Sequence, residues 1–374
     1  MKNNNSYKVF IVAGEESGDL HASKLVQHIK KYNQHIEFYG HGGDRMEKEG
    51  VQIIEHINKL AIVGFVEVIK YLPFMMSVMG KTINWIKENK PERIILVDYP
   101  GFNLRLAKES KRLGIPVTYF ILPQVWAWKE KRVSILRDNV DQCLSIIPFE
   151  QEWFEKRNVK TSFIGHPFIE LKYPNLSLDF YKKHDLDPND KILSIFPGSR
   201  QQEVKQHLPI LIKTIEKIML DIPNLNVVLG KAPGVSIGNI PSFIKIEREH
   251  PQFALQYGNA ALVASGTATL ESAVLDIPIV VFYRFSSLTW LLAKNMSSVK
   301  FACIVNLIAN KMIVPEFIQN NMTVNNLANA IIPLLNNTAS RKNMLLGYDQ
   351  IRRTLGIPGV YDRGAQEIIK RLPI

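Results

Sequence analysis

The sequence predicts an α/β fold built from two doubly wound parallel sheets. Short β-branched runs alternate with amphipathic stretches along all 374 residues, as expected where helices cross over between parallel strands. A weakly patterned segment rich in Pro, Asn, Asp and Lys follows Gly165-His166-Pro167 and separates two similar sets of strands. Because domains usually contain about 100–200 residues, the length also favours two of them. We expect an N-terminal domain over residues 1–170 and a C-terminal domain over residues 171–374.

The first half alternates strands and helices in an order typical of one doubly wound unit. Apolar, β-branched runs predict strands near Lys8–Ala13, Glu37–Tyr39, Arg93–Val97, Val117–Ile121, Cys143–Ile146 and Ser162–Ile164. Apolar residues at helical spacing predict helices near Leu20–Tyr32, Lys81–Glu88, Leu104–Leu113 and Gln151–Lys156. These helices would connect strands that run in the same direction.

The second half repeats the pattern. It predicts strands near Lys191–Phe196, Asn226–Leu229, Ile244–Ile246, Ala261–Ala264 and Ile279–Phe282. It predicts helices near Val204–Leu220, Thr269–Leu275, Val324–Leu335 and Arg341–Leu355. The C-terminal helices are compatible with two arrangements: packing back on the protein's own domains, or exchange with a second copy in a homodimer.

The composition is that of a globular protein with excess positive charge. With 46% hydrophobic and 22% charged residues, the chain is neither disordered, collagen-like nor a coiled coil. The 46 Lys and Arg against 35 Asp and Glu leave a net charge of +11, which suits nucleic acid, an anionic membrane surface or phosphorylated substrates. The net charge is the sole support for nucleic acid, since the sequence contains no RNP-like aromatic motif and no recognisable helix-turn-helix.

Cysteine use and hydropathy indicate a cytoplasmic protein without a membrane span. Cys143 and Cys303 lie far apart in apolar runs, which argues against a disulfide framework or a Cys-based zinc site. The N-terminus lacks the apolar core and cleavage site of a secretory signal. The uncharged run Tyr71–Gly80 is shorter than the about 18 residues that a spanning helix needs, and the longer run His250–Leu270 is interrupted by polar residues. The histidine spacings predict no metal centre.

Four loops carry unusual residues directly after predicted strands, where parallel sheets bind ligands. They are Gly14–Asp19, Asp98–Asn103, Pro197–Arg200 and Ser265–Glu271. The first loop lacks the G-x-G-x-x-G spacing, and its two glutamates would repel a pyrophosphate, which disfavours a nicotinamide dehydrogenase. A plain strand-to-helix turn with Ser17 or Asp19 as N-cap fits it equally well.

The two loops of the second half have the features of a diphosphate site. Gly198 permits close backbone approach, the next helix offers free N–H groups, and Arg200 adds a charged donor. Ser265-Gly266-Thr267 is a second such turn, and Glu271 is placed to accept hydrogen bonds from ribose hydroxyls. Helix capping would explain either turn alone, but their recurrence in one domain favours a nucleotide diphosphate.

Asp98 is the best candidate for catalysis. A carboxylate directly after an apolar strand and beside a Pro-Gly turn can lie partly dehydrated in a cleft and act as a general base. A cap for the helix beginning near Asn103 explains the same residue equally well.

A series of longer motifs runs through the chain between Val9 and Asn306. They are GEESGDLHA (Gly14 to Ala22), GHGGDRMEKEG (Gly40 to Gly50), VGFVEV (Val63 to Val68), DYPGFN (Asp98 to Asn103), PQVWAWKEKR (Pro123 to Arg132), PFEQEWF (Pro148 to Phe154), GHP (Gly165 to Pro167), PGSR (Pro197 to Arg200) and SGTATLE (Ser265 to Glu271). In this order they resemble the lipid-A-disaccharide synthase family. The GEESGD, VWAW and PGSR blocks are the most specific.

The resemblance implies a GT-B glycosyltransferase, in which two Rossmann-like domains face a central cleft. It also implies transfer of 2,3-diacylglucosamine from its UDP derivative to the 6-hydroxyl of 2,3-diacylglucosamine 1-phosphate, which yields a β-1,6 disaccharide and UDP without a metal or other cofactor. Many relatives carry a second carboxylate three residues after the aspartate, where this chain has Gly101. Asp98 therefore has no rival in its own loop.

Site roles follow from the same resemblance. Asp98 would deprotonate or orient the acceptor hydroxyl, and Arg200 with the amides around Gly198 and Ser199 would stabilise the leaving UDP. Glu271 would hold the ribose. Ser265, Gly266 and Thr267 would lie near the phosphates. The weaker carry-overs, expected to line the cleft, are Glu15, Ser17, Asn103, Gln124 and Asn306.

Because both substrates carry acyl chains, the resemblance also implies contact with the inner membrane from its cytoplasmic side. The apolar run flanked by Lys70 and Lys81 suits this role, since lysines can meet anionic headgroups. Its candidate acyl or membrane contacts are Phe74, Met75, Met76 and Met79. An ordinary buried helix would show the same run.

The sequence leaves three alternative functions, two of them enzymatic. A peptidoglycan N-acetylglucosaminyltransferase or a UDP-sugar epimerase shares the predicted fold. A basic nucleic-acid-binding protein is the remote alternative.

Overall fold

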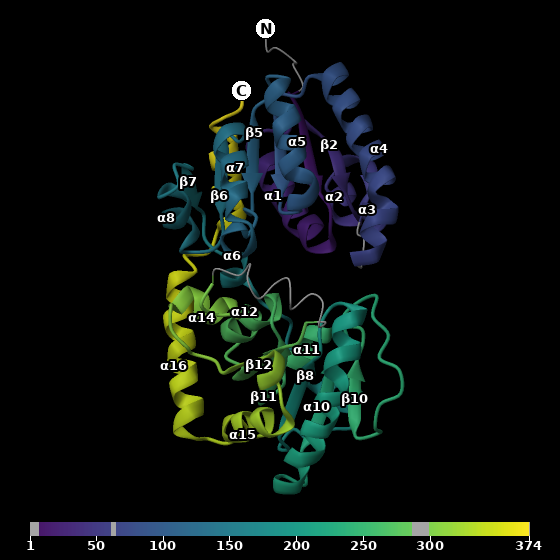
Figure 1. Cartoon of the computed structure of the whole chain (residues 1–374), viewed down its shortest axis with the longest axis vertical. Coiled ribbons are helices and arrows are strands. Elements are labelled where there is room, and N and C mark those ends of the chain that lie inside the picture. Colours follow the sequence, from purple (N-terminus) through teal and green to yellow (C-terminus); the bar gives the residue numbers. More distant parts are fainter. Residues whose placement is uncertain (1–6, 61–64, 286–298, 374) are drawn as a thin grey trace. The chain divides into compact units, whose positions relative to one another are not determined.

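The computed structural model describes residues 7–60, 65–285 and 299–373, which form two compact units. One unit comprises Met1–Pro167 together with Gly356–Ile374, and the other comprises Phe168–Leu355 (Figure 1). The sequence-based division at residue 170 did not include the return of Gly356–Ile374 to the first unit.

The first unit is built on a seven-stranded sheet whose neighbouring strands all pair in parallel. In spatial order the strands are β3 (Val51–His56), β2 (Ile36–Gly42), β1 (Tyr7–Ala13), β4 (Arg93–Val97), β5 (Val117–Phe120), β6 (Gln142–Ser145) and β7 (Thr161–Phe163). The β3 strand was not predicted, because its apolar residues are interrupted by Gln52 and Glu55. The central strands β1 and β4 are buried on both faces, which explains their nearly unbroken apolar runs.

Helices cover both faces of this sheet. On one face, α5 (Pro100–Arg112) packs between α4 (Phe65–Asn89) and α7 (Val133–Asn139). On the other, α1 (Glu16–Tyr32) packs against α2 (Asp44–Lys48) and α17 (Val360–Ile369) (Figure 1). The short helices of the unit are α3 (Ile57–Leu60), α6 (Val125–Trp128), the 3₁₀ turn Glu130–Arg132 and α8 (Glu150–Glu155).

The C-terminal helix α17 belongs to the first unit because its apolar face is buried there. Gly356 and Gly359 adopt positive φ angles of 93° and 95°, which end the preceding helix and redirect the chain. The buried face of α17 includes Val360, Ala365 and Ile368. This helix was absent from the sequence-based expectations, and the preceding one, α16 (Ala339–Thr354), remains in the second unit.

The second unit contains a six-stranded parallel sheet. Its spatial order is β10 (Ile244–Glu247), β9 (Asn226–Gly230), β8 (Ile192–Phe196), β11 (Ala260–Ala264), β12 (Ile279–Tyr283) and β13 (Glu316–Ile318). Its helices are α9 (Ser177–His184), α10 (Gln201–Asp221), α11 (Pro251–Gln256), α12 (Thr267–Val274), α14 (Ile304–Ala309), α15 (Val324–Leu335) and α16 (Ala339–Thr354), with 3₁₀ turns at Pro167–Glu170 and Gln319–Asn321. The segment expected to be a plain connector therefore contains α9.

Each sheet has one point at which the strand order reverses. In the first unit, the chain proceeds from β1 to β2 and β3 on one side and from β4 to β7 on the other. In the second unit, it proceeds from β8 to β10 on one side and from β11 to β13 on the other. The loops after β1 and β4, and those after β8 and β11, therefore open at the positions where doubly wound sheets bind ligands. All four loops singled out from the sequence lie there.

Candidate active site

Asp98 lies in a strained turn at the carboxyl end of β4. Asp98 and Tyr99 both adopt left-handed backbone conformations, with φ angles of 46° and 47°. Such non-glycine residues cost of order 1–3 kcal/mol each and persist where their surroundings hold them. The following helix, α5, begins at Pro100, and its N-cap residue is Tyr99 without a side-chain cap. Asp98 is thus not the helix cap that the sequence left open as its alternative role.

Two buried side chains hold the carbonyl of this turn. Asn103 donates from Nδ2 to the carbonyl oxygen of Asp98 over 2.8 Å, and Tyr119 donates from its hydroxyl to the same oxygen over 2.6 Å. Both side chains are fully buried. Asn103 therefore supports the turn from below, which corrects the expectation that it lines a cleft. Tyr119, on β5, was not recognised from the sequence because a tyrosine within a strand ordinarily packs in the core.

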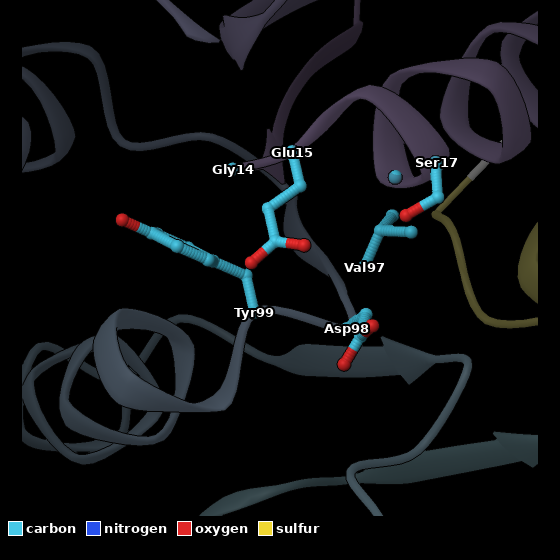
Figure 2. A pocket seen from close by; sticks show the side chains of 7 residues that line it. Gly14, Glu15, Ser17, Val97, Asp98 and Tyr99 are labelled. Atoms are coloured by element: carbon cyan, nitrogen blue, oxygen red, sulfur yellow. The ribbon is translucent and has the colours of Figure 1, made fainter. Parts of the chain in front are cut away.

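The loop after β1 completes a shallow pocket beside Asp98. Gly14 lies against the ring of Tyr99, where an added Cβ would come within 2.3 Å of a ring carbon. The pocket is lined by Gly14, Glu15, Ser17, Gly18, Val97, Asp98 and Tyr99. Figure 2 shows the carboxyl group of Glu15 extending toward the turn that carries Asp98 and Tyr99. Glu15 and Ser17, predicted as weaker site residues, thus lie in the same pocket as Asp98.

The environment of Asp98 favours its neutral form more than water does. Burial, with a smaller contribution from the negative charge of Glu15, raises the pKa of Asp98 to about 6, although a hydrogen bond from the backbone N–H of Tyr99 opposes both effects. A carboxyl group that titrates near neutral pH can accept a proton and release it again. These are the properties expected of a general base.

The Gly14–Asp19 loop is a strand-to-helix turn, but the N-cap residue of the helix is not one of the two expected from the sequence. The N-cap of α1 is Glu15, without a side-chain cap, so neither Ser17 nor Asp19 fills that position. Asp19 is buried and instead accepts hydrogen bonds from the backbone N–H groups of Gly43, Arg45 and Met46. It therefore caps α2 and ties this helix to α1.

A second unusual carboxyl group of this unit is Glu150, at the start of α8. Glu150 is completely buried, and Trp126 donates from Nε1 to its Oε1 over 3.0 Å. Burial, with a smaller contribution from the charge of Asp98, raises the pKa of Glu150 to about 8, although the hydrogen bond from Trp126 opposes this shift. Glu150 is hence largely protonated at pH 7. The two residues belong to the VWAW and PFEQEWF motifs, but the sequence did not indicate their contact.

In the second unit, the Pro197–Arg200 turn follows β8 as predicted, but two of its backbone amides are bonded within the protein. Oε2 of Glu203 accepts hydrogen bonds from the backbone N–H groups of Ser199 and Arg200, at 2.9 and 3.2 Å. Gly198 has a φ angle of 135°, and an added Cβ would lie 2.5 Å from the Glu203 side chain. Of the amides around Gly198 and Ser199 that were expected to bind a diphosphate, that of Ser199 therefore donates to an internal carboxylate, and the diphosphate role of these amides stays a prediction. Arg200 keeps an exposed side chain.

The Ser265–Thr267 turn lies after β11, the strand next to β8. Ser265 donates from its hydroxyl to the carbonyl of Ala302, whereas Gly266 and Thr267 are exposed. Glu271, one helical turn further, accepts a hydrogen bond of 2.6 Å from the hydroxyl of Tyr173, and burial raises its pKa. The predicted donor-site residues thus gather at the carboxyl edge of one sheet, with Ser265 turned to an internal partner.

The remaining predicted residues divide by exposure. Gln124 is exposed in the loop after β5. Asn306 is fully buried and bonds Ile313, Val314 and Glu316, so it is structural in this unit, contrary to the expected cleft lining. No group of three or more His, Cys, Asp or Glu among the described residues is arranged to hold a metal ion.

The predicted membrane contacts lie on α4, and most of them face the core. Phe74, Met75 and Met79 are partly buried and pack against the core of the first unit, whereas 64% of Met76 is exposed. Leu72 is also 45% exposed. Within the described part of the chain, no helix combines the length and the hydropathy that a membrane span requires.

Comparison with known proteins decides between the enzyme classes that share this fold. Residues 9–358 match the family described as Lipid-A-disaccharide synthetase. The lipid-A-disaccharide synthase of Solibacter usitatus (strain Ellin6076) is 36% identical over 97% of this chain and 98% of its own length. The chain belongs to the lipid-A-disaccharide synthase family. It is thus an enzyme of the glycosyltransferase class.

Solved structures support the fold that the sequence predicted. The UDP-GlcNAc 2-epimerase from Neisseria meningitidis, solved bound to UDP-GlcNAc, has a TM-score of 0.68 at 11% identity, over 97% of this chain and 100% of that chain. A structure titled as the glycotransferase of kitacinnamycin has a TM-score of 0.65 at 14% identity, over 99% and 100%. With two doubly wound parallel sheets, these likenesses confirm the GT-B fold class. At such low identity the epimerase likeness concerns the fold alone, so family membership favours the disaccharide synthase over the epimerase, the peptidoglycan transferase and the nucleic-acid-binding alternatives.

Proposed function

We propose that this chain transfers a 2,3-diacylglucosamine unit from its UDP derivative to the 6-hydroxyl of 2,3-diacylglucosamine 1-phosphate. The hydroxyl oxygen forms a bond to the anomeric carbon, the bond from that carbon to UDP breaks, and the hydroxyl proton passes to a base. The products are a β-1,6 disaccharide and UDP. Family membership supports the formation of the lipid A disaccharide. The observation that carries the chemistry is Asp98 in its strained, partly dehydrated turn.

Asp98 is suited to take the proton. With a pKa of about 6, it is mostly ionised at pH 7 yet remains a stronger base than an ordinary aspartate. The hydrogen bonds from Asn103 and Tyr119 use the carbonyl of Asp98 and leave its carboxyl group for the substrate. The turn is therefore held without neutralising the group that reacts.

Arg200 supplies the positive charge that a departing diphosphate needs. A guanidinium group forms strong, charge-assisted hydrogen bonds to phosphate oxygens, and these strengthen as negative charge develops on the leaving group. Gly266 and Thr267 offer an exposed turn on the neighbouring strand, and Glu271 is proposed to accept from the ribose. In this proposal, a ribose hydroxyl of the bound donor replaces the hydroxyl of Tyr173 as the hydrogen-bond donor to Glu271.

The experiment follows UDP release from the acylated UDP-glucosamine donor, with and without the acyl-glucosamine 1-phosphate acceptor. We expect release to depend on the acceptor and kcat to fall about 10²–10⁴-fold in Asp98→Asn, because the amide cannot accept the proton. UDP binding should be unchanged in this variant. Asp138→Asn, at an exposed ion pair with Arg137, is the matched control and should retain full activity. Full activity of Asp98→Asn would remove Asp98 from the reaction, and no release by the native protein would refute the proposed reaction.

We also propose a peripheral attachment to the cytoplasmic face of the inner membrane through α4. Leu72 and Met76 are exposed and four residues apart, so they share one face of the helix. Replacing both by Ser should weaken binding to phosphatidylglycerol vesicles several-fold while the protein remains folded, because these side chains add little to the core. Leu220→Ser, 82% exposed on α10, is the control. Unchanged vesicle binding in the double variant would refute the role of this face.

A further inference from the structure

We propose that Glu203 is a positioning residue that holds Arg200 and the Pro197–Arg200 turn in place for the donor diphosphate. This inference rests on the proposed function, in which Arg200 contacts the diphosphate. Glu203 is the third residue of α10 and is nearly buried, with 9% of its surface exposed. It touches no predicted catalytic atom and acts through the arginine.

The carboxylate of Glu203 joins four donors. Oε2 accepts from the backbone N–H groups of Ser199 and Arg200, at 2.9 and 3.2 Å. Oε1 accepts from Nη1 of Arg200 at 3.2 Å and from the hydroxyl of Tyr283 at 2.8 Å. Capping of the helix requires only Oε2, which accepts from the two backbone amides. The contacts of Oε1 are the ones that orient the side chain of Arg200.

These contacts span the part of the sheet where the donor is proposed to bind. Glu203 follows β8, whereas Tyr283 is the last residue of β12, and β11 lies between these two strands. The exposed turn Gly266–Thr267 follows β11. The link from Glu203 to Tyr283 therefore bridges the loops on either side of that turn.

A histidine joins the same two loops independently. His207, one turn further along α10, is fully buried. Its Nδ1 lies 2.6 Å from the carbonyl oxygen of Pro197, and its Nε2 lies 3.0 Å from the backbone N–H of Arg284. With Nδ1 donating and Nε2 accepting, both ring nitrogens are used. The Pro197–Arg200 turn is thus anchored to the end of β12 at two points.

Arg200 retains the capacity to bind an anion in this arrangement. About 65% of its side chain is exposed, and its Nη1 bonds Glu203. A guanidinium group has five N–H donors in a rigid plane, so fixing one nitrogen sets the direction of the others. A residue that fixes this plane reduces the conformational entropy lost when the diphosphate binds.

The test is a double-mutant cycle between Glu203 and Arg200, measured by UDP affinity and by kcat/KM for the donor. Glu203→Gln keeps an acceptor oxygen for the two amides but places an NH₂ group where Oε1 meets the guanidinium. We expect Glu203→Gln to lower both quantities by about 10–100-fold. In an Arg200→Ala background the same substitution should cause no further loss, since its effect passes through the arginine. Tyr283→Phe should show a smaller loss in the same direction.

Glu216→Gln is the matched control, because Glu216 is exposed on the same helix. Thermal unfolding of each variant separates folding from positioning. An equal loss from Glu203→Gln with and without Arg200 would assign Glu203 to helix capping and overturn the inference, and an unchanged UDP affinity would also overturn it. If Arg200→Ala retained native UDP affinity, both the role of Arg200 and that of Glu203 would be refuted. Glu203-dependent UDP binding without acceptor-dependent UDP release would sustain the inference and refute the proposed reaction.

Discussion

Asp98 and Glu203 occupy comparable positions in the two units but have opposite environments. Each follows a central strand at the point where the strand order reverses, Asp98 in the loop after β4 and Glu203 in the first turn of α10 after β8. Asp98 is partly dehydrated beside the negative charge of Glu15, and its pKa rises to about 6. Glu203 is surrounded by donors from Ser199, Arg200 and Tyr283. A carboxylate with few donors remains able to react, whereas one with its oxygens bonded becomes part of the scaffold.

The backbone conformation also differs between the turn at Asp98 and the turn before Arg200. The turn at Asp98 places non-glycine residues in the left-handed region, and side chains from α5 and β5 hold its carbonyl. The turn before Arg200 uses Gly198 at a φ angle of 135°, which a residue without Cβ adopts at little cost. Strain is therefore concentrated at the proposed base and nearly absent at the proposed donor site.

The strongest test of this contrast removes the support under the strained turn. Asn103→Ala deletes the donor to the Asp98 carbonyl, so the turn can relax and displace the carboxyl group. We expect kcat to fall about 100-fold, because small misplacements of a catalytic group are costly. Steady-state UDP release measures the effect. Asn139→Ala, which removes a similar side-chain bond to the carbonyl of Ile135 in α7, should leave kcat unchanged. Equal losses in both variants would indicate a general effect on folding.

A second prediction concerns stability and the buried carboxyl of Glu150. Burial raises the folded-state pKa of Glu150 to about 8 from an ordinary value of 4.5, so the native state holds a proton that the unfolded chain releases. This cost to stability grows as the pH rises from about 4.5 to about 8. Glu150→Gln keeps the acceptor for Trp126 and removes the cost. We expect a gain of roughly 2–4 kcal/mol in unfolding free energy at pH 8 and little gain near pH 4.5.

Urea unfolding at several pH values measures this difference. Glu155→Gln, an exposed position on the same helix, should change little at any pH. A loss of stability in Glu150→Gln at pH 8 would contradict the assignment of Glu150 as a neutral acid. Glu203→Gln should behave in the opposite way and lose stability, because its carboxylate is fully bonded.

The smallest expected effect sharpens the comparison at Asp98 itself. The negative charge of Glu15 contributes to the raised pKa of Asp98, so Glu15→Gln should lower that pKa. A general base is active when ionised, and the acid limb of the pH profile of kcat/KM should therefore move to lower pH. Glu16→Gln, the exposed neighbour, is the control. A shift to higher pH, or equal shifts in both variants, would contradict the electrostatic coupling.

Local patterns were sufficient to predict most strands and the four loops that matter. The apolar runs of β1, β4, β8 and β11 are buried on both faces, so their composition alone identifies them. Strands β3 and β13 and helix α17 were among the elements missed, since their patterns are short and their burial depends on distant partners. The family resemblance, carried by motifs spread along the chain, identified the enzyme class without any geometry.

The roles inside the site depended on contacts that no local pattern contains. Tyr283 lies 80 positions from Glu203 in the sequence, and Tyr119 lies 21 positions from Asp98. The sequence by itself determined the α/β class, the loops at the carboxyl edges and Asp98 as the candidate base, because periodicity and chain order are local properties. Tertiary structure alone decided that the Ser199 and Arg200 amides are occupied, that Asn103 and Asn306 are buried, and that α17 joins the first unit. Burial and hydrogen-bond partners arise from segments distant in the chain, and they determine whether a polar group binds a ligand or supports the fold.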